Sequence, residues 1–178
     1  MLVQNIRVSV GSDDAEENNS GTVNIPHGTI ELVFDRNNQI VGIRFTNVQV
    51  PHGATILYSY IQFQAETTNS QLTTLTITGQ AADNPLTFKN SKRNISSRGR
   101  TQNSTSWSPV EWMVINEAGD NQRTSDLSSI VQEIIDRPGW SQGNSIVIIF
   151  EGSGVRTAWS FNGLPAGAPL LHIEYLLP

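Results

Sequence analysis

Carboxylate side chains are concentrated in one short stretch near the start of the chain. Within residues 12–19, Asp13, Asp14, Glu16 and Glu17 fill four of five consecutive positions, and asparagines follow them. Calcium takes six to eight oxygen ligands at about 2.3–2.6 Å, and a loop of this composition could supply several of them. The spacing differs from that of an EF-hand loop. The segment therefore predicts either a calcium site of another type or a solvated acidic loop.

Aromatic residues form a second group, because a flat ring beside hydrogen-bonding groups suits the apolar face of a sugar. Tyr58 and Tyr60 should lie on the strand face opposite the apolar residues of the same run, since side chains alternate along a strand. On an open face the two rings would form a platform about 6.5–7 Å long, whereas on a covered face both would be core. Trp112 and Trp159 are further stacking candidates. We expect at least one of Trp107 and Trp112 to be exposed, because both flank a polar Ser-Pro step.

Basic residues are clustered as well. Lys89, Lys92, Arg93, Arg98 and Arg100 fall within twelve residues that contain no acid, although the whole chain has only 11 Lys and Arg. Arginine matches carboxylate and sulfate groups with paired hydrogen bonds. Arg98 and Arg100 are therefore the predicted polar partners of a glycan, an acidic one included. The alternative is a polar loop kept soluble by its charge.

Patterns that would support catalysis are missing from the sequence. His27, His52 and His172 each stand alone, and the first two lie in Pro-His-Gly turns. The sequence contains no HExxH, GxSxG or P-loop motif and no cysteine. A carboxylate pair distant in sequence would escape this test, so a polysaccharide-active enzyme stays as the last alternative. The pattern favours a non-catalytic protein.

Strand patterns surround these groups. Apolar and polar residues alternate in many short segments, which is typical of half-buried antiparallel strands. These segments are residues 6–10, 30–34, 41–45, 57–65, 75–79, 157–161 and 171–175. The continuous apolar run 146–150 predicts a central strand covered on both faces. Turn residues at 36–38, 51–53 and 162–163 separate the strands.

One segment has helical spacing instead. Leu127, Ile130, Val131, Ile134 and Ile135 recur at three- and four-residue intervals. Thr124 or Ser125 could cap the first turn, and the sequence Arg-Pro-Gly at 137–139 ends the pattern. We predict a helix of about residues 125–136 that covers an open end or edge of the sheets, with Trp140 filling the core behind it.

Composition bounds the class of protein. The chain has 178 residues, 15% charged residues and a net charge of −5, which fits one domain over residues 1–178 and disfavours nucleic acid as a partner. The longest apolar run is far too short to cross a membrane, so membrane insertion is not expected. No leader pattern is visible. We predict an all-β jelly-roll β-sandwich of two antiparallel sheets with one short helix, excised from a larger secreted or cell-surface protein.

Several stretches together carry a family resemblance. Residues 43–48, 50–56 and 59–63, followed by 140–145 and 168–175, resemble the jelly-roll modules of the DNRLRE type and related carbohydrate-binding modules. The chain departs from that type because it has no DNRLRE-like string and carries an extended region over 84–116. The resemblance implies a glycan-binding or cell-surface module attached to larger enzymes or adhesins. It also implies a structural calcium near the chain's start and end, where Glu174 on the last strand could complete the acidic site.

The predicted function is therefore a secreted, non-catalytic carbohydrate-binding module with a structural calcium ion. The expected polysaccharide ligand stacks on aromatic rings and accepts hydrogen bonds from arginines. The predicted binding residues are Tyr58, Tyr60, Trp112, Trp159, Arg98 and Arg100, and the predicted calcium ligands are Asp13, Asp14, Glu16, Glu17 and Glu174. The alternative is a structural or adhesive module without a sugar site.

Overall fold

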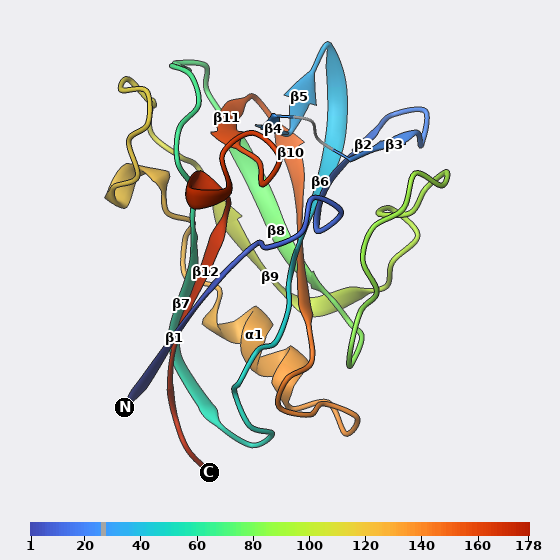
Figure 1. Ribbon diagram of the computed structural model, residues 1–178, viewed down its shortest axis with the longest axis vertical. Coiled ribbons are helices and arrows are strands. Elements are labelled where there is room, and N and C mark those ends of the chain that lie inside the picture. The colour runs from blue at the N-terminus through green and yellow to red at the C-terminus, as the bar shows by residue number, and fades with distance from the viewer. Residues whose placement is uncertain (26–27) are drawn as a thin grey trace.

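The computed structural model describes residues 1–25 and 28–178, and this part of the chain is a sandwich of antiparallel β-sheets with one α-helix (Figure 1). Sheet A has the strand order β1 (Leu2–Arg7), β12 (Leu170–Leu176) and β7 (Thr55–Gln62). Sheet B has the order β3 (Val23–Asn24), β2 (Asp14–Asn18), β6 (Asn37–Phe45), β10 (Ile146–Ser153), β8 (Thr74–Gln80) and β9 (Arg100–Trp107). The short β5 (Phe34–Asp35) pairs with β6, and β4 (Thr29–Leu32) pairs with β11 (Arg156–Trp159).

The main core lies between the two sheets. Alternate residues of the strands point inward, and most apolar residues of the predicted patterns are buried there. Val10, Phe34 and Leu57 are the exceptions, because each is exposed. Phe63 stacks on Trp107 with ring centroids 5.8 Å apart, and its edge contact with Phe150 links the chain after β7 to β10. Trp140 is buried and donates its indole N–H to the Val50 carbonyl, which confirms that it fills the core.

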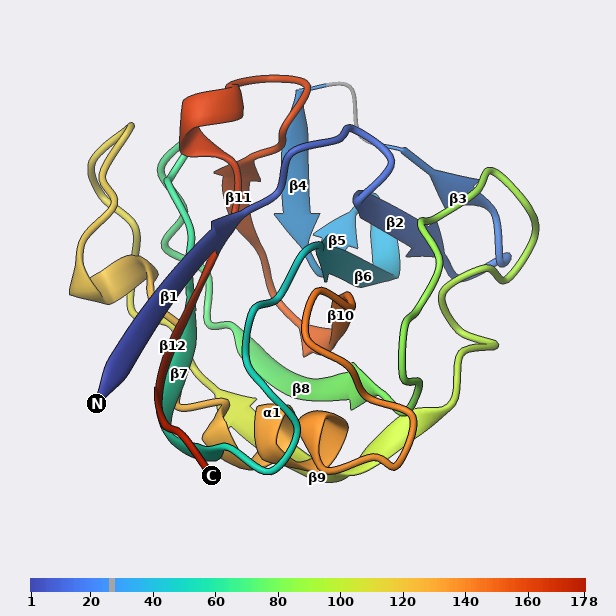
Figure 2. The same ribbon diagram turned by 60° about the horizontal axis from the view of Figure 1, so that its bottom comes forward.

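The outer face of sheet B is also covered. The segment 82–99 runs along this face (Figures 1 and 2) and places Phe88 and Ile95 in a second apolar cluster with Val147 and Ile149. Gly42 of β6 makes this contact possible, because a Cβ atom at this position would lie 2.6 Å from the Phe88 ring. The buried run of β10 is therefore covered on both faces, as its sequence predicts.

Helix α1 (Ser128–Ile135) closes one side of the sandwich. It packs against β7 of sheet A and against β8 and β9 of sheet B (Figure 2), with all four of its apolar residues buried. The helix begins later than predicted, and Leu127 is its N-cap. The reason is that residues before it run beside β7: the Thr124 N–H donates to the Ile61 carbonyl and the Leu127 N–H to the Ser59 carbonyl.

The all-β class, the single helix and the turns at 51–53 and 162–163 are confirmed within the described residues. The turn predicted at Arg36 joins β5 to β6. The jelly-roll connectivity stays a prediction. Three strands, β2, β3 and β9, were not predicted, and β1 covers residues 2–7 where the pattern predicted 6–10. The turn predicted at Pro26 and His27 lies outside the described residues. Among the described helices, none has the length and apolar character needed to cross a membrane.

Candidate functional site

The outer face of sheet A carries the predicted tyrosines, and we call it the tyrosine face. Its members are Val3 and Asn5 of β1, His172 and Glu174 of β12, Tyr58 and Tyr60 of β7, and the neighbouring Arg123. The strand register sets these side chains in rows across the sheet, Val3–Glu174–Tyr58 and Asn5–His172–Tyr60. Directly paired residues point to the same side of a sheet. The prediction that both tyrosines lie opposite the apolar residues of β7 is therefore confirmed.

Tyr60 is held in a stack of side chains. Its ring is 4.6 Å from that of His172 at 21°, and the Arg123 guanidinium lies 4.8 Å from the ring centroid. His172 belongs to β12 on one side of β7, whereas Arg123 belongs to the segment bonded to the other side. Arg123 is fixed by Gln62, to whose side-chain oxygen it donates at 2.7 Å. Tyr60 is half-buried as a result.

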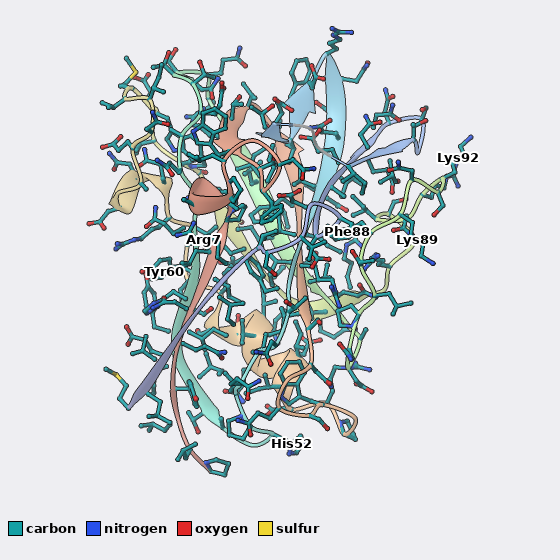
Figure 3. The ribbon with its side chains drawn as sticks, in the orientation of Figure 1. Arg7, His52, Tyr60, Phe88, Lys89 and Lys92 are labelled. Carbon is teal, nitrogen blue, oxygen red and sulfur yellow. The ribbon has the colours of Figure 1, made fainter. Side chains whose placement is uncertain are left out.

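Tyr58 is the exposed ring of this face, with 39% of its surface accessible. It lies 5.6 Å from Tyr60 but is tilted by 51°, so the two rings do not form one flat platform. Hydrogen-bonding groups lie next to it: His172 contacts Asn5 at 2.8 Å through Nδ1 and Glu174 at 3.2 Å through Nε2. The face thus offers one free ring bordered by an ordered polar row. Figure 3 shows Tyr60 on this side of the molecule.

The tryptophan predictions need correction. Trp107 and Trp112 are both buried, and Trp112 has no accessible surface because its ring packs on Phe63 and its N–H donates to the Asn121 carbonyl. Trp112 therefore cannot stack on a sugar. Trp159 is half-buried on β11, where its N–H donates to Asn116 at 2.8 Å. It belongs to a different sheet from the tyrosines.

The acidic segment is a strand, β2, and its carboxylates point to both faces of sheet B. Asp13, just before β2, forms an ion pair with Arg44 at 2.9 Å. On the same face, Glu17 accepts the N–H groups of Ile95 and Ser96 at 2.8 and 2.9 Å, which fixes segment 82–99. Residue positions alternate along a strand, so Asp14 and Glu16 lie on the opposite face.

Burial changes the ionisation of these two carboxyls. Burial raises the pKa of Asp14 to about 7. The hydrogen bond that Asp14 accepts from the Phe161 N–H at 2.8 Å lowers the pKa, whereas the nearby charge of Asp13 raises it further. The other Asp14 oxygen, Oδ1, has no hydrogen-bond partner among the described residues. Burial and the adjacent carboxylate of Glu31 raise the pKa of Glu16. Glu31 of β4 is also bonded to Glu16 through its backbone N–H at 2.7 Å.

The five predicted calcium ligands do not come together. Glu174 lies on the tyrosine face of sheet A, between Val3 and Tyr58, although β1 and β12 are neighbours as expected. The four acids of β2 divide between the two faces of sheet B. Among the described residues, no three His, Asp or Glu side chains are placed to hold a metal ion. The donor set therefore does not fit the predicted calcium site.

The two predicted binding arginines hold the chain itself. Arg98 donates to the carbonyls of Asn94, Leu86 and Thr87 and lies 4.3 Å from the Phe88 ring centroid. Its guanidinium thus clasps segment 82–99 and has a structural role. Arg100 is likewise engaged, with a 2.7 Å ion pair to Glu151. The local sequence pattern did not indicate these contacts.

The other three cations of the segment are available. Lys89, Lys92 and Arg93 are exposed, and within the described chain their side chains make no ion pair or hydrogen bond. Figure 3 shows Lys89 and Lys92 directed away from the molecule, on the side opposite Tyr60, whereas Phe88 points towards the strands. The prediction of a charged polar loop therefore fits residues 89–93 and not Arg98 or Arg100.

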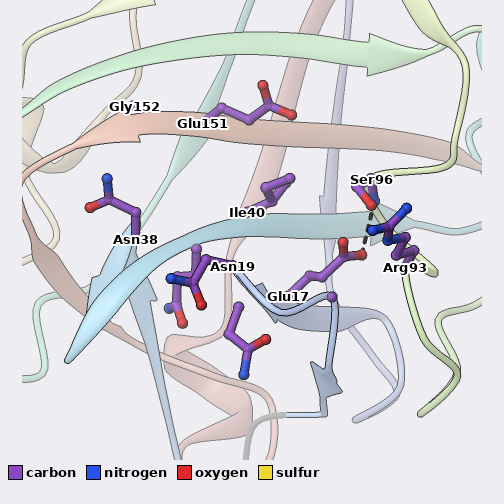
Figure 4. Close-up of a pocket in the computed structure, with 11 residues that line it drawn as sticks. Glu17, Asn19, Asn38, Ile40, Arg93, Ser96, Glu151 and Gly152 are labelled. Carbon is purple, nitrogen blue, oxygen red and sulfur yellow. Dashed lines mark hydrogen bonds between the residues drawn. The ribbon is translucent and has the colours of Figure 1, made fainter.

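A pocket of about 350 Å³ lies beside Arg93, and we call it the amide pocket (Figure 4). It is formed by the ends of β2, β6 and β10 together with segment 82–99. Its lining residues include Asn18, Asn19, Asn38, Gln39, Ile40, Arg93, Glu17 and Glu151. Amides and charged groups thus surround a single branched apolar side chain. Sequence reasoning missed this pocket, because its residues come from four separate stretches.

Comparison of the sequence with protein-family models gives no match, and comparison with curated proteins gives none either. The resemblance to DNRLRE-type modules stays a prediction. What the chain binds has to be inferred from the geometry of its own residues.

Proposed function

We propose that the chain binds a polysaccharide without catalysis, through the tyrosine face. The observation that carries this proposal is the exposed Tyr58 ring set beside the ordered polar row of Asn5, His172 and Glu174. A sugar ring presents an apolar C–H face and a rim of hydroxyl groups. The Tyr58 ring suits the first, and the carboxylate, imidazole and amide groups suit the second.

The stack around Tyr60 supports the same role. The contacts with His172 and Arg123 fix the Tyr60 ring, and the Tyr58 ring packs against it. A ring that is already ordered loses little conformational entropy on binding, and this favours affinity. Bound to a glycan, the module would raise the local concentration of any domain attached to it. Extracellular or cell-surface location follows as part of this proposal.

The test is affinity gel electrophoresis against a panel of neutral polysaccharides, followed by calorimetry with the best oligosaccharide. We expect Tyr58→Ala to weaken binding about tenfold, which corresponds to about 1.4 kcal/mol and to the energy of one aromatic contact. Tyr58→Phe is the matched control, since it keeps the ring, and it should retain most of the affinity. Failure of every polysaccharide to retard the protein, or equal binding by Tyr58→Ala, would refute the proposal.

One observation favours the alternative of an adhesive module without a sugar site. The turn after the buried Trp112 exposes three consecutive apolar residues, Met113, Val114 and Ile115, each with more than half of its surface accessible. Glu111 and Glu117 flank this turn, so it would fit an apolar depression with a basic rim on a partner protein. This alternative predicts that no saccharide binds, so the same panel separates the two functions.

A further inference from the structure

We infer that the amide pocket is a second saccharide site and that it takes a sugar unit bearing a carboxylate or sulfate group. The inference shares with the proposed function the premise that the ligand is a saccharide. It uses no residue of the tyrosine face, and the pocket lies on sheet B, so the two sites can be tested separately.

The walls of the pocket are fixed by contacts within the chain. Glu17 is held by the N–H groups of segment 82–99, and the Asn18 side-chain oxygen accepts the N–H groups of Ser20 and Thr22 at 3.0 Å. Gln39 donates to the Glu31 carbonyl at 2.7 Å. Figure 4 shows the bond from Ser96 to Glu17 at the edge of the pocket. A pocket that is already formed suits a small ligand, and its volume falls in the usual range for such sites.

Three polar side chains that line the pocket are left without internal partners. The side chains of Asn19, Asn38 and Arg93 form no hydrogen bond or ion pair within the described residues, whereas their neighbours do. The two amides each offer donors and an acceptor, which is what sugar hydroxyl groups require. Ile40 lies between them and Glu151 and supplies an apolar contact for the C–H face of the ring (Figure 4).

The charges around the pocket favour an anionic ligand. Glu151 is paired with Arg100, and Glu17 accepts two backbone N–H groups, so both lining carboxylates are already engaged within the chain. Among residues 1–25 and 28–178, neither Arg93 nor the preceding Lys92 has an ion-pair partner. A guanidinium can donate two parallel hydrogen bonds to a carboxylate or sulfate. The acid group of the sugar is therefore expected at Arg93 and its hydroxyl groups at Asn19 and Asn38.

The test uses trigalacturonate, its methyl ester and a sulfated carrageenan tetrasaccharide as probes, with calorimetry and side-chain amide NMR. We expect at least one acidic probe to bind and to shift the side-chain NH₂ signals of Asn19 and Asn38. Arg93→Gln should weaken this binding about tenfold, the loss expected for a charge-assisted contact. Asn38→Asp should weaken it as well, because it adds a negative charge where the acidic probe binds. Thermal melting checks that both variants fold.

Lys89→Gln is the matched control, because Lys89 is an exposed cation of the same segment that does not line the pocket. The affinity of this variant for the acidic probe should stay within about twofold of the wild-type value. Tyr58→Ala should have no effect on the acidic probe. Three outcomes would overturn the inference. They are a failure of both acidic probes to bind, equal affinity for trigalacturonate and its methyl ester, and an equal loss of affinity in Arg93→Gln and Lys89→Gln. None of these results would bear on the binding of a neutral polysaccharide that depends on Tyr58.

Discussion

The buried Asp14 should make the protein less stable as the pH rises. Its pKa moves from 3.8 to about 7 on folding. Between these values the unfolded chain has lost the proton while the folded chain keeps it, so the free energy of unfolding falls by about 1.4 kcal/mol per pH unit. The stabilisation is complete below pH 3.8, declines as the pH rises, and is gone above pH 7. From pH 5 to pH 8 the loss amounts to about 3 kcal/mol.

Asp14→Asn isolates this contribution. The amide keeps an oxygen for the Phe161 N–H, carries no charge, and places a donor where the unpartnered Oδ1 now lies. We expect the free energy of unfolding of the variant to exceed that of the wild type by an amount that grows with pH, by about 3 kcal/mol between pH 5 and pH 8. Burial also raises the pKa of Glu16, so the stability of the variant should still fall in part as the pH rises.

The assay is urea denaturation at pH 5, 6, 7 and 8, read as the midpoint at constant slope. Asp35→Asn is the matched control, because it makes the same chemical change on an exposed side chain of β5. It should leave the pH dependence as in the wild type. The reasoning would be wrong if the wild-type denaturation curves superimposed from pH 5 to 8. It would also be wrong if the stability of Asp14→Asn fell with pH as steeply as that of the wild type.

Three further predictions concern stability. Arg156 is buried and donates five hydrogen bonds, four of them to backbone carbonyls. Arg156→Ala should therefore lower the free energy of unfolding, measured by chemical denaturation, by at least about 3 kcal/mol. A loss below about 1 kcal/mol would show that these bonds do not stabilise the fold. Gly42→Ala should cost about 1–3 kcal/mol and increase proteolysis within 82–99, because its Cβ would displace the Phe88 ring; an unchanged digestion pattern would argue against the contact. A chelator should leave the melting midpoint unchanged, since the predicted calcium ligands do not converge; a drop of several degrees would reveal an ion site.

Local patterns predicted the strands whose two faces differ in polarity. The alternating runs of β6, β7, β8 and β12 and the apolar run of β10 were all recognised, because one or both of their faces are buried in an apolar core. β2 was missed because its buried residues are mostly acids, held by long-range bonds that the sequence does not show. β9 was missed because it is an edge strand with a polar, largely exposed middle.

Half of the tyrosine face could also be predicted. The period of β7 placed Tyr58 and Tyr60 correctly, and His172 faces outward as the pattern of β12 indicates. Arg123 and Asn5 could not be found, because only strand pairing brings them beside the tyrosines. Arg98 was predicted to bind a ligand but instead fixes segment 82–99, because nothing in the local sequence distinguishes a guanidinium that holds a loop from one that faces solvent.

The positions of the two ends of the chain have a practical consequence. Val3 and Glu174 lie in one row with Tyr58, so both termini leave the molecule at the same end of sheet A (Figure 1). A tag, a bead or a chip surface attached at either terminus would crowd Tyr58 and could mask a saccharide there. The amide pocket, on sheet B, would stay accessible.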